Sequence, residues 1–443
     1  ISSLTAQQLT RMSDLLNTVK ICDPAIGSGA FPMGLLQEIF AIKELIAFET
    51  SSNWEPAKVK ENIIQNSIYG VDIEKGAVDI ARLRFWLSLI VNEEKPKALP
   101  NLDYKIVVGD SLLSKFEDEI IEINWDKTGS VGKADEYVKN VQRLLKEVAK
   151  KQKDYFNEEG NSKKKIATEI RDLKIDLLIN QLSFNKESYT NKNSVKIDNG
   201  LGLSAKDLKT NDVVLGEIDR FNKTINNLIK IKSDKLRPFN HFDWKLDFPE
   251  ILNPLLFEGN IDSIGFDIVI VNPPYIGQSG NRDLFRDVLK TKLGEDYHQR
   301  RMDYFYFFFH KSIRLSKKET VISFITTNYF LNATYADKLR KDIYLNCDII
   351  KLINFNEAKI FESATGQHNA ITILKVGKKS QRYVKTSTTT HKGIINGKTI
   401  NKILYGNDTK TSYFNFLSSE IFENEKFHIL IEGSSEIESN NPK

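Results

Sequence analysis

Apolar and polar positions alternate at two different spacings in the first third of the chain. Short apolar runs bounded by glycine, proline or acidic residues predict strands, and longer stretches with an apolar residue at every third or fourth position predict helices. The predicted order is strand, helix, strand, helix, strand, over residues 19–24, 28–48, 67–73, 75–91 and 104–110. This βαβαβ order is typical of a parallel, doubly wound sheet.

A long polar stretch then interrupts the alternation. Residues 111–264 are rich in Lys, Glu and Asn, and their apolar residues recur at helical spacing, which predicts long amphipathic helices. A solvated helical appendage is a simpler interpretation of them than a DNA clamp. The aromatic stretch HFDWKLDFPEIL (241–252) leads back to sheet-forming sequence.

Sheet-forming sequence returns in the last third of the chain. A buried strand is predicted to begin at Phe266, and further strands are predicted at 320–330, 348–355 and 369–376, with helices at 303–316 and 333–344. The 68 residues after Lys375 are rich in Thr, Lys and Asn, and we expect them to begin another region.

Composition narrows the class of protein only slightly. The chain has 443 residues and a formal net charge of +4, which permits a polyanionic partner without requiring one. Its two cysteines, Cys22 and Cys347, form no disulfide framework, so we expect a reducing, cytoplasmic location. No apolar run is long enough to span a membrane. The first residue is not Met, so we expect a piece of a longer protein.

Candidate chemistry lies at the ends of the predicted strands. The stretch DPAIGSGAF (23–31) contains Gly27 and Gly29, which allow a tight turn and close approach of the backbone to a ligand. An ordinary glycine-rich turn explains it about as well. Asp72 and Asp110 end the next two strands, where either one alone is better explained as a turn or a helix cap. Asp23, Asp72 and Asp110 are acidic residues at three successive strand ends, and together they predict a nucleoside pocket.

The fourth strand ends abruptly at Asn-Pro-Pro-Tyr. Asn272 offers a side-chain carbonyl, and the following proline restricts the direction of the Pro273 carbonyl. Two acceptors at a fixed separation suit one NH₂ group with two donors, and Tyr275 offers a flat face for stacking. The alternative is a plain structural turn, but a functional site explains better why this sequence directly follows a buried strand.

The stretches DPAIGSGAF, YGVDI, GDSLL and FDIVIVNPPY, in this order, resemble the adenine-specific (N6-amino) DNA methyltransferases. They resemble most those in bifunctional type IIG restriction-modification enzymes, as does HFDWKLDFPE. The resemblance covers residues 19–110 and 241–376. It implies an α/β, Rossmann-like, S-adenosylmethionine-dependent methyltransferase fold with a doubly wound mixed seven-stranded sheet and a large helical insertion.

The resemblance divides the chain into four regions. We expect residues 1–110 to form the cofactor-binding half of the methyltransferase domain and residues 265–376 to form its catalytic half. Residues 111–264 would be the helical insertion. Residues 377–443 would begin a target-recognition or linker region.

In such enzymes the cofactor is S-adenosylmethionine. The implied residues are Asp23, Ala25, Gly27 and Gly29 for the methionine end, Asp72 for the ribose, Ile73 for the adenine ring, and Asp110, with Ser111 or Leu112 beside it, for the adenine amine.

The resemblance also implies how a target adenine is held. The base would leave the duplex, and Asn272 and Pro273 would accept both N–H bonds of its amino group. This would localise the nitrogen lone pair, which then attacks the sulfonium methyl. Tyr275 would stack on the base from one side and Phe361 from the other, with Phe355 as the alternative.

Double-stranded DNA is the implied partner, and its phosphates require cations. The stretch after the catalytic loop, 281–301, carries six candidates. They are Arg282, Arg286, Lys290, Lys292, Arg300 and Arg301. An ordinary solvated helix face is about equally plausible for them.

Departures from the family pattern leave alternatives open. No Thr-Pro pair precedes Asp23, and the 68 residues that remain are too few for a complete target-recognition domain. We therefore expect a fragment of a full-length chain that also carries this domain and an amino-terminal nuclease. A methyltransferase acting on RNA or on a protein glutamine fits Asn-Pro-Pro-Tyr too, and a non-catalytic DNA-binding subunit is a further rival. The six histidines and two cysteines show no metal-ligand spacing, so no metal is expected.

Overall fold

The chain forms two compact units. The computed structural model describes residues 4–91, 101–117, 119–121, 125, 133–193, 195, 204–257, 259–361, 368–377 and 383–432. Residues 1–114 and 260–443 form one unit, here called the sheet unit, and residues 115–259 form the other, the helical unit. The helical unit lies within the range predicted for the helical insertion.

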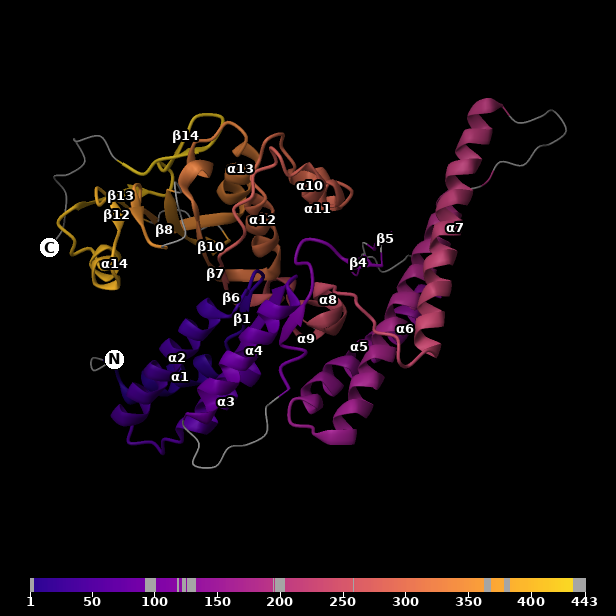
Figure 1. Cartoon of the computed structure of the whole chain (residues 1–443), viewed down its shortest axis with the longest axis horizontal. Helices are drawn as coiled ribbons and strands as arrows, with labels where there is room; N and C mark the ends of the chain where they lie inside the picture. Colours follow the sequence, from indigo (N-terminus) through magenta and orange to yellow (C-terminus); the bar gives the residue numbers. More distant parts are fainter. Residues whose placement is uncertain are drawn as a thin grey trace. The chain divides into compact units, whose positions relative to one another are not determined.

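The sheet unit is built on a nine-stranded sheet in the order β13-β11-β8-β10-β7-β6-β1-β2-β3. Figure 1 labels β13, β8, β10, β7, β6 and β1 of this sheet. Its strands are β1 (Ile21–Asp23), β2 (Ile68–Asp72), β3 (Ile106–Val108), β6 (Phe266–Val271), β7 (Ser316–Thr327), β8 (Cys347–Asn354), β10 (Asn369–Val376), β11 (Tyr383–Thr389) and β13 (Thr411–Leu417).

The seven strands predicted from the sequence are neighbours in this sheet. Strands β3, β2, β1, β6 and β7 run parallel, and β10 is antiparallel to both β7 and β8. The predicted doubly wound, mixed α/β sheet is therefore confirmed. Two more strands extend it, since β11 pairs parallel with β8 and β13 pairs antiparallel with β11. Both come from the stretch after Lys375 that was expected to begin another region.

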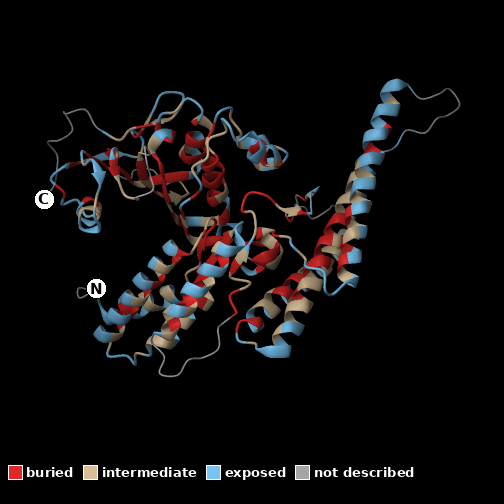
Figure 2. Ribbon diagram, viewed as in Figure 1, coloured by how far each residue is buried: buried red, intermediate tan, exposed pale blue. Residues whose placement is uncertain are grey.

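Helices pack along this sheet. Helix α2 packs on β1 and β6, α4 on β2 and β3, and α12 on β6 and β7. Figure 2 shows buried residues concentrated in the central strands and in α12. The helices of the unit are α1 (Ala6–Thr18), α2 (Ala30–Glu49), α3 (Pro56–Ser67), α4 (Lys75–Ile90), α10 (Arg282–Val288), α11 (Lys292–Tyr297), α12 (Phe305–Leu315), α13 (Asp337–Asn346) and α14 (Gly397–Leu404).

Short elements complete the unit. They are the 3₁₀ turns η2 (Ile261–Ser263) and η3 (Asn328–Leu331), and the small strands β9 (Ala358–Lys359), β12 (Gly393–Ile394), β14 (Phe422–Glu423) and β15 (His428–Ile429). None of the helices that the structure describes is long and apolar enough to cross a membrane.

The fifth strand of the sheet differs from its predicted range. A strand was predicted over 320–330, but β7 begins four residues earlier and ends at Thr327. The chain then turns into η3, because Phe330 is buried against the rings of Phe305 and Phe309. Tertiary packing of one aromatic ring thus ends a strand that β-propensity alone would continue.

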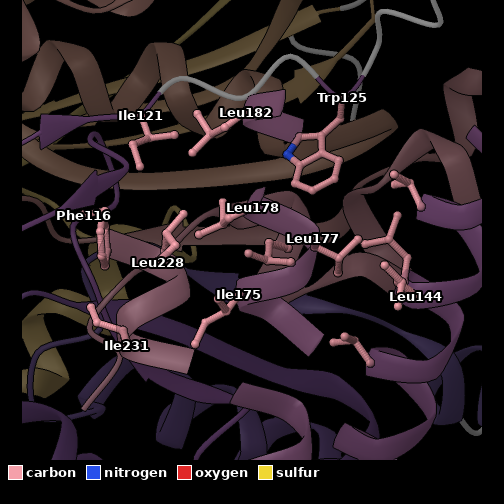
Figure 3. Close-up of a cluster of buried hydrophobic side chains, with 14 residues drawn as sticks. Phe116, Ile121, Trp125, Leu144, Ile175, Leu177, Leu178, Leu182, Leu228 and Ile231 are labelled. Atoms are coloured by element: carbon pink, nitrogen blue, oxygen red, sulfur yellow. The ribbon is translucent and has the colours of Figure 1, made fainter. Parts of the chain in front are cut away.

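The helical unit is built on three long helices, α5 (Lys133–Tyr155), α6 (Gly160–Lys192) and α7 (Ala205–Ser233). Two short helices, α8 (Trp244–Asp247) and α9 (Pro249–Leu252), follow, with η1 (Pro254–Leu256) and the hairpin of β4 (Lys115–Phe116) and β5 (Glu119–Ile120). A buried apolar cluster joins these elements and includes Leu178, Leu228 and Trp125 (Figure 3). The predicted amphipathic helices are confirmed.

The aromatic stretch 241–252 supplies a buried polar contact to this unit. Lys174 Nζ lies 2.6 Å from Asp247 Oδ1, and both side chains are buried. The second oxygen of Asp247 accepts the backbone N–H of Asp243 at 2.9 Å. Asp243 in turn accepts the indole N–H of Trp125 at 3.1 Å. The stretch therefore contributes to the core of the helical unit, in which Asp247 is paired with Lys174.

Candidate functional site

The predicted site residues lie at one edge of the sheet. The parallel strands β1, β2, β3 and β6 all end there, so Asp23, Asp72, Asp110 and Asn272 follow or end neighbouring strands. The chain order reverses between β1 and β6, which are adjacent and parallel. Such a reversal opens a crevice at the carboxyl ends of the strands, where α/β proteins bind ligands.

Asp23 is a buried carboxyl group with one unused oxygen. Its Oδ1 accepts the backbone N–H of Ala25 at 3.0 Å, whereas Oδ2 has no hydrogen-bond partner among the described residues. Burial raises the pKa of Asp23 to about 8, the N–H of Ala25 opposes this, and the charge of Asp72 adds to it. A cationic ligand would give Oδ2 a hydrogen-bond partner and would offset the repulsion between Asp23 and Asp72.

The glycine-rich turn leaves β1 in a conformation that glycine favours. Gly27 has φ +51, and a Cβ atom added there would have no heavy atom within 4 Å; Gly29 has φ +79 and caps α2. The N–H of Gly27 donates to Asp72 Oδ2 at 2.8 Å. The turn therefore has open space beside it and is tied to the end of β2.

The second and third acidic strand ends also accept backbone N–H groups. Asp72 Oδ1 accepts from Glu74 at 2.9 Å, and Asp110 Oδ1 accepts from Leu112 at 2.9 Å. Each carboxylate has further lone pairs. Ser111 is buried and donates its hydroxyl to the carbonyl of Pro24 at 2.5 Å, so it ties the third strand end to the glycine-rich turn.

Ile73 is 71% exposed. It directly follows Asp72, where a flat apolar ligand could cover it. Gly70 was not singled out from the sequence. A Cβ there would lie 2.3 Å from the Cδ1 atom of Ile26, so only glycine lets the turn after β1 pack against β2. A lone glycine inside a predicted strand was the available signal.

The Asn-Pro-Pro-Tyr stretch follows β6 directly. Asn272 is exposed and Pro273 is buried. The Tyr275 hydroxyl lies 2.8 Å from Asn272 Oδ1 and 2.8 Å from the carbonyl of Ile325. Its ring meets the edge of Phe305 at a centroid distance of 6.1 Å. Burial raises the pKa of Tyr275. No described residue donates a hydrogen bond to the carbonyl of Pro273.

The two candidates for the second stacking ring differ in burial. Phe355 is fully buried in a cluster with Ile353, Ala358 and Ile403, so neither face of its ring is free. This burial corrects the alternative that named Phe355. Phe361 is half-buried, and the six residues that follow it lie outside the described ones. It stays a prediction.

The segment after Tyr275 pairs with the start of α12. Gly277 forms an antiparallel bridge with Asp303, and the N–H of Tyr304 donates to the carbonyl of Ile276 at 2.7 Å. Burial, and next the charge of Asp110, raise the pKa of Tyr304. The charge effect links Tyr304 of the catalytic half to the third acidic strand end, a relationship that no sequence spacing indicated.

The same pairing holds Arg301 in a left-handed conformation. Its φ is +62, and its backbone N–H donates to Gln278 Oε1 at 2.7 Å. A non-glycine residue in this region is strained, and such residues concentrate at functional sites.

The six candidate phosphate-binding cations fall into two groups. Arg286, Lys290 and Lys292 each pair with an acidic residue three or four positions away. The guanidinium groups of Arg282, Arg300 and Arg301 are exposed and have no ion-pair partner among the described residues. The second group is therefore better placed to contact phosphates. No group of three metal-ligating side chains occurs in the described part of the chain.

Two family models match this sequence. Residues 66–361, about two thirds of the chain, match the model described as Eco57I restriction-modification methylase. Residues 2–125 match the model described as MmeI, DNA-methyltransferase domain.

Curated relatives are longer than this chain. A candidate type II restriction enzyme and methyltransferase of Methanocaldococcus jannaschii is 27% identical over an alignment of 364 positions, which covers 77% of this chain and 28% of that protein. The type II methyltransferase M.HincII of Haemophilus influenzae is 30% identical over 162 residues, which are 35% of this chain and 30% of that protein. The chain thus spans less than a third of either relative.

Solved structures give weaker likenesses. A modification subunit of a type I restriction enzyme from Vibrio vulnificus is 11% identical, with a TM-score of 0.42, over 96% of this chain and 57% of that one. The DrdV–DNA complex is 11% identical, with a TM-score of 0.44, over 98% of this chain and 30% of that one. Both TM-scores are below 0.5 and establish nothing by themselves. On the match over residues 66–361, the chain belongs to the Eco57I restriction-modification methylase family.

Proposed function

We propose that this chain is the methyltransferase part of a restriction-modification enzyme and transfers a methyl group from S-adenosylmethionine to the N6 amino group of an adenine in DNA. The observation that carries the proposal is the position of Asn272–Tyr275 directly after β6, the strand that neighbours β1, whose end holds the Asp23 oxygen without a hydrogen-bond partner among the described residues. Family membership supports the reaction class.

The residues at the ends of β1, β2 and β3 suit this cofactor. When bound, S-adenosylmethionine supplies an electrophilic methyl group on a sulfonium. Asp23 offers its unpartnered Oδ2 to the ammonium of the methionine end. Asp72 has lone pairs left for the ribose hydroxyls, and the exposed side chain of Ile73 offers an apolar surface to the adenine ring.

The chain's own part in methyl transfer is to hold the target nitrogen. The lone pair of an adenine amine is delocalised into the ring, so the amine is a poor nucleophile. Asn272 and the Pro273 carbonyl accept its two N–H bonds, which favours a tetrahedral nitrogen. Because these bonds strengthen as the nitrogen gains positive charge, they stabilise the transition state more than the ground state.

The target base stacks on Tyr275, and we retain Phe361 as the second ring. Flipping a base costs a few kcal/mol, and stacking returns about 1–3 kcal/mol per base. Arg300 and Arg301 lie just before Asp303, which pairs with Gly277 after the catalytic loop. They contact phosphates near the flipped base.

In the full-length protein we expect a target-recognition domain and a nuclease beside this part. The name of the relative from Methanocaldococcus jannaschii gives that protein restriction and methyltransferase activities, and this chain spans 28% of it.

Transfer of labelled methyl groups tests the proposal. The protein is incubated with S-adenosylmethionine labelled in its methyl group and, separately, unmethylated genomic DNA, RNA or protein. We expect label in DNA as N6-methyladenine, identified by chromatography of the nucleosides, and its loss in Asn272→Ala with cofactor binding retained. Label in cytosine, RNA or a protein glutamine would replace the proposal with one of its rivals.

A further inference from the structure

The hydroxyl of Tyr275 faces two oxygen atoms but has only one proton. Its Oη lies 2.8 Å from Asn272 Oδ1 and 2.8 Å from the carbonyl oxygen of Ile325. Both neighbours accept hydrogen bonds and neither donates one. With the amide oxygen of Asn272 turned toward the hydroxyl, one of these two contacts brings lone pairs together at hydrogen-bond distance.

One of the two acceptors is fixed and the other is free to turn. The carbonyl of Ile325 belongs to the backbone of β7, which is paired along its length with β10. The side-chain amide of Asn272 is exposed, and its oxygen and nitrogen exchange places when the amide rotates by half a turn. Rotation brings Nδ2 to face Oη and satisfies every group, because Oη then donates to Ile325 and accepts from Asn272.

We propose that the Tyr275 hydroxyl is a positioning group that donates its proton to the carbonyl of Ile325, accepts an N–H from Asn272 Nδ2, and so turns Asn272 Oδ1 outward toward the substrate amine. The inference rests on the proposed function for its consequence, since an outward oxygen is what an incoming NH₂ group needs. With the opposite orientation, the amide NH₂ would face the NH₂ of the substrate, and no hydrogen bond would form.

The surroundings of Tyr275 hold its hydroxyl in the position and the protonation state that this arrangement requires. Its ring packs edge-on against Phe305, which fixes the position of Oη. Burial raises the pKa of the phenol, which favours the protonated hydroxyl that this arrangement needs. The direction of Asn272 is thereby set through its neighbour, separately from the stacking role of the same ring.

A double-mutant cycle separates orientation from stacking. Tyr275→Phe keeps the ring and removes the hydroxyl, and Asn272→Asp places an oxygen at both ends of the side chain, so its orientation no longer matters. We expect Tyr275→Phe to lower the single-turnover rate of methyl transfer to unmethylated genomic DNA by about three- to tenfold in the Asn272 protein, the effect of one net hydrogen bond. In the Asn272→Asp background the same change should have almost no effect.

The same loss in both backgrounds, or no loss in the Asn272 protein, would overturn the proposal. Cofactor affinity by calorimetry and the unfolding temperature of Tyr275→Phe serve as controls, and both should remain near the parent values. They show that any loss of rate does not come from a damaged fold.

Neutron diffraction from deuterium-exchanged crystals of the protein tests the arrangement without any activity. We expect the deuteron on Tyr275 Oη to point to the carbonyl of Ile325, and two deuterons on the Asn272 atom that faces Oη. A deuteron pointing from Oη to Asn272 would refute the inference. This map decides the question if Asn272→Asp has no measurable rate. It also separates the inference from the proposed function, because the hydrogen bonds exist whether or not DNA is the substrate.

Discussion

The carboxylate of Asp72 accepts the backbone N–H of Gly27 at 2.8 Å, a contact between residues 45 positions apart. It ties the turn after β1 to the end of β2 through a carboxylate acceptor, beside the backbone hydrogen bond from the Ile26 N–H to the Val71 carbonyl at 3.0 Å. Hydrogen bonds to a charged acceptor contribute more than neutral ones. Asp72 therefore shapes the pocket in addition to any contact that it makes with a ribose.

Replacing Asp72 should abolish or strongly weaken cofactor binding. Asp72→Ala removes the ribose acceptor and releases the Gly27 turn, and we expect S-adenosylmethionine affinity to fall by at least about tenfold in titration calorimetry. Asp72→Asn retains one acceptor for Gly27 and should have an intermediate effect. Asp79→Ala is the matched control, because Asp79 is an exposed acid on α4 that pairs with Arg82. Unchanged affinity in Asp72→Ala would contradict the pocket assignment.

Cofactor binding should release a proton from Asp23. The pKa of Asp23 in the free protein is about 8, so the carboxyl group is protonated below that pH. A cationic ligand favours the ionised form, and affinity should therefore rise as the pH approaches 8 from below. Calorimetry in two buffers of different ionisation enthalpy counts the released protons. We expect no such release in Asp23→Asn.

The same group makes the stability of the sheet unit depend on pH. An unfolded Asp has a pKa of about 3.9, so between there and about 8 the folded state holds a proton that the unfolded state has lost. Stability contributed by this proton is present at low pH and is lost as the pH rises through this window, by at most about 1.4 kcal/mol per pH unit. Denaturant unfolding should show a flatter dependence on pH for Asp23→Asn.

The exposed arginines after the catalytic loop should contribute to DNA affinity. Arg300→Ala and Arg301→Ala should weaken DNA binding and lower the slope of log affinity against log salt by about 0.9 for each phosphate that is no longer neutralised. Arg286→Ala and Lys290→Ala are matched controls, since both cations are exposed but paired with Asp283 and Asp287. Equal effects in both pairs would mean that only the net charge matters.

The buried ion pair of the helical unit should be more important for stability than an exposed pair of the same length. Lys174→Met leaves Asp247 charged and buried, and we expect the helical unit to lose about 3 kcal/mol of unfolding free energy.

Lys232 lies 2.6 Å from Asp176, and both side chains are about one third exposed. Lys232→Met should cost about 1 kcal/mol or less. Tryptophan fluorescence reports both, because Trp125 and Trp244 are buried in this unit. Equal losses would show that burial of Lys174 is not decisive.

The elements of the fold were predicted more successfully than their ends. The strand at 369–376 has the predicted bounds. Strand β7 does not, because the packing of Phe330 ends it early. Strands β11 and β13 were not predicted. The sequence of β11, YVKTSTT, is Thr-rich, and that of β13, TSYFNFL, is a short aromatic stretch; pairing with β8 and with each other makes them strands.

The order of short motifs along this chain by itself determined the fold class and the identity of the candidate site. Strand and helix periods, turn residues and the acidic strand ends are local features, so they are visible without coordinates. Only the tertiary structure decided which atoms of the site are free. The unpartnered oxygen of Asp23, the bond from Gly27 to Asp72, the burial of Phe355 and the shared hydroxyl of Tyr275 depend on distances between segments far apart in the chain. Those distances come from packing the whole sheet unit, which no local pattern encodes.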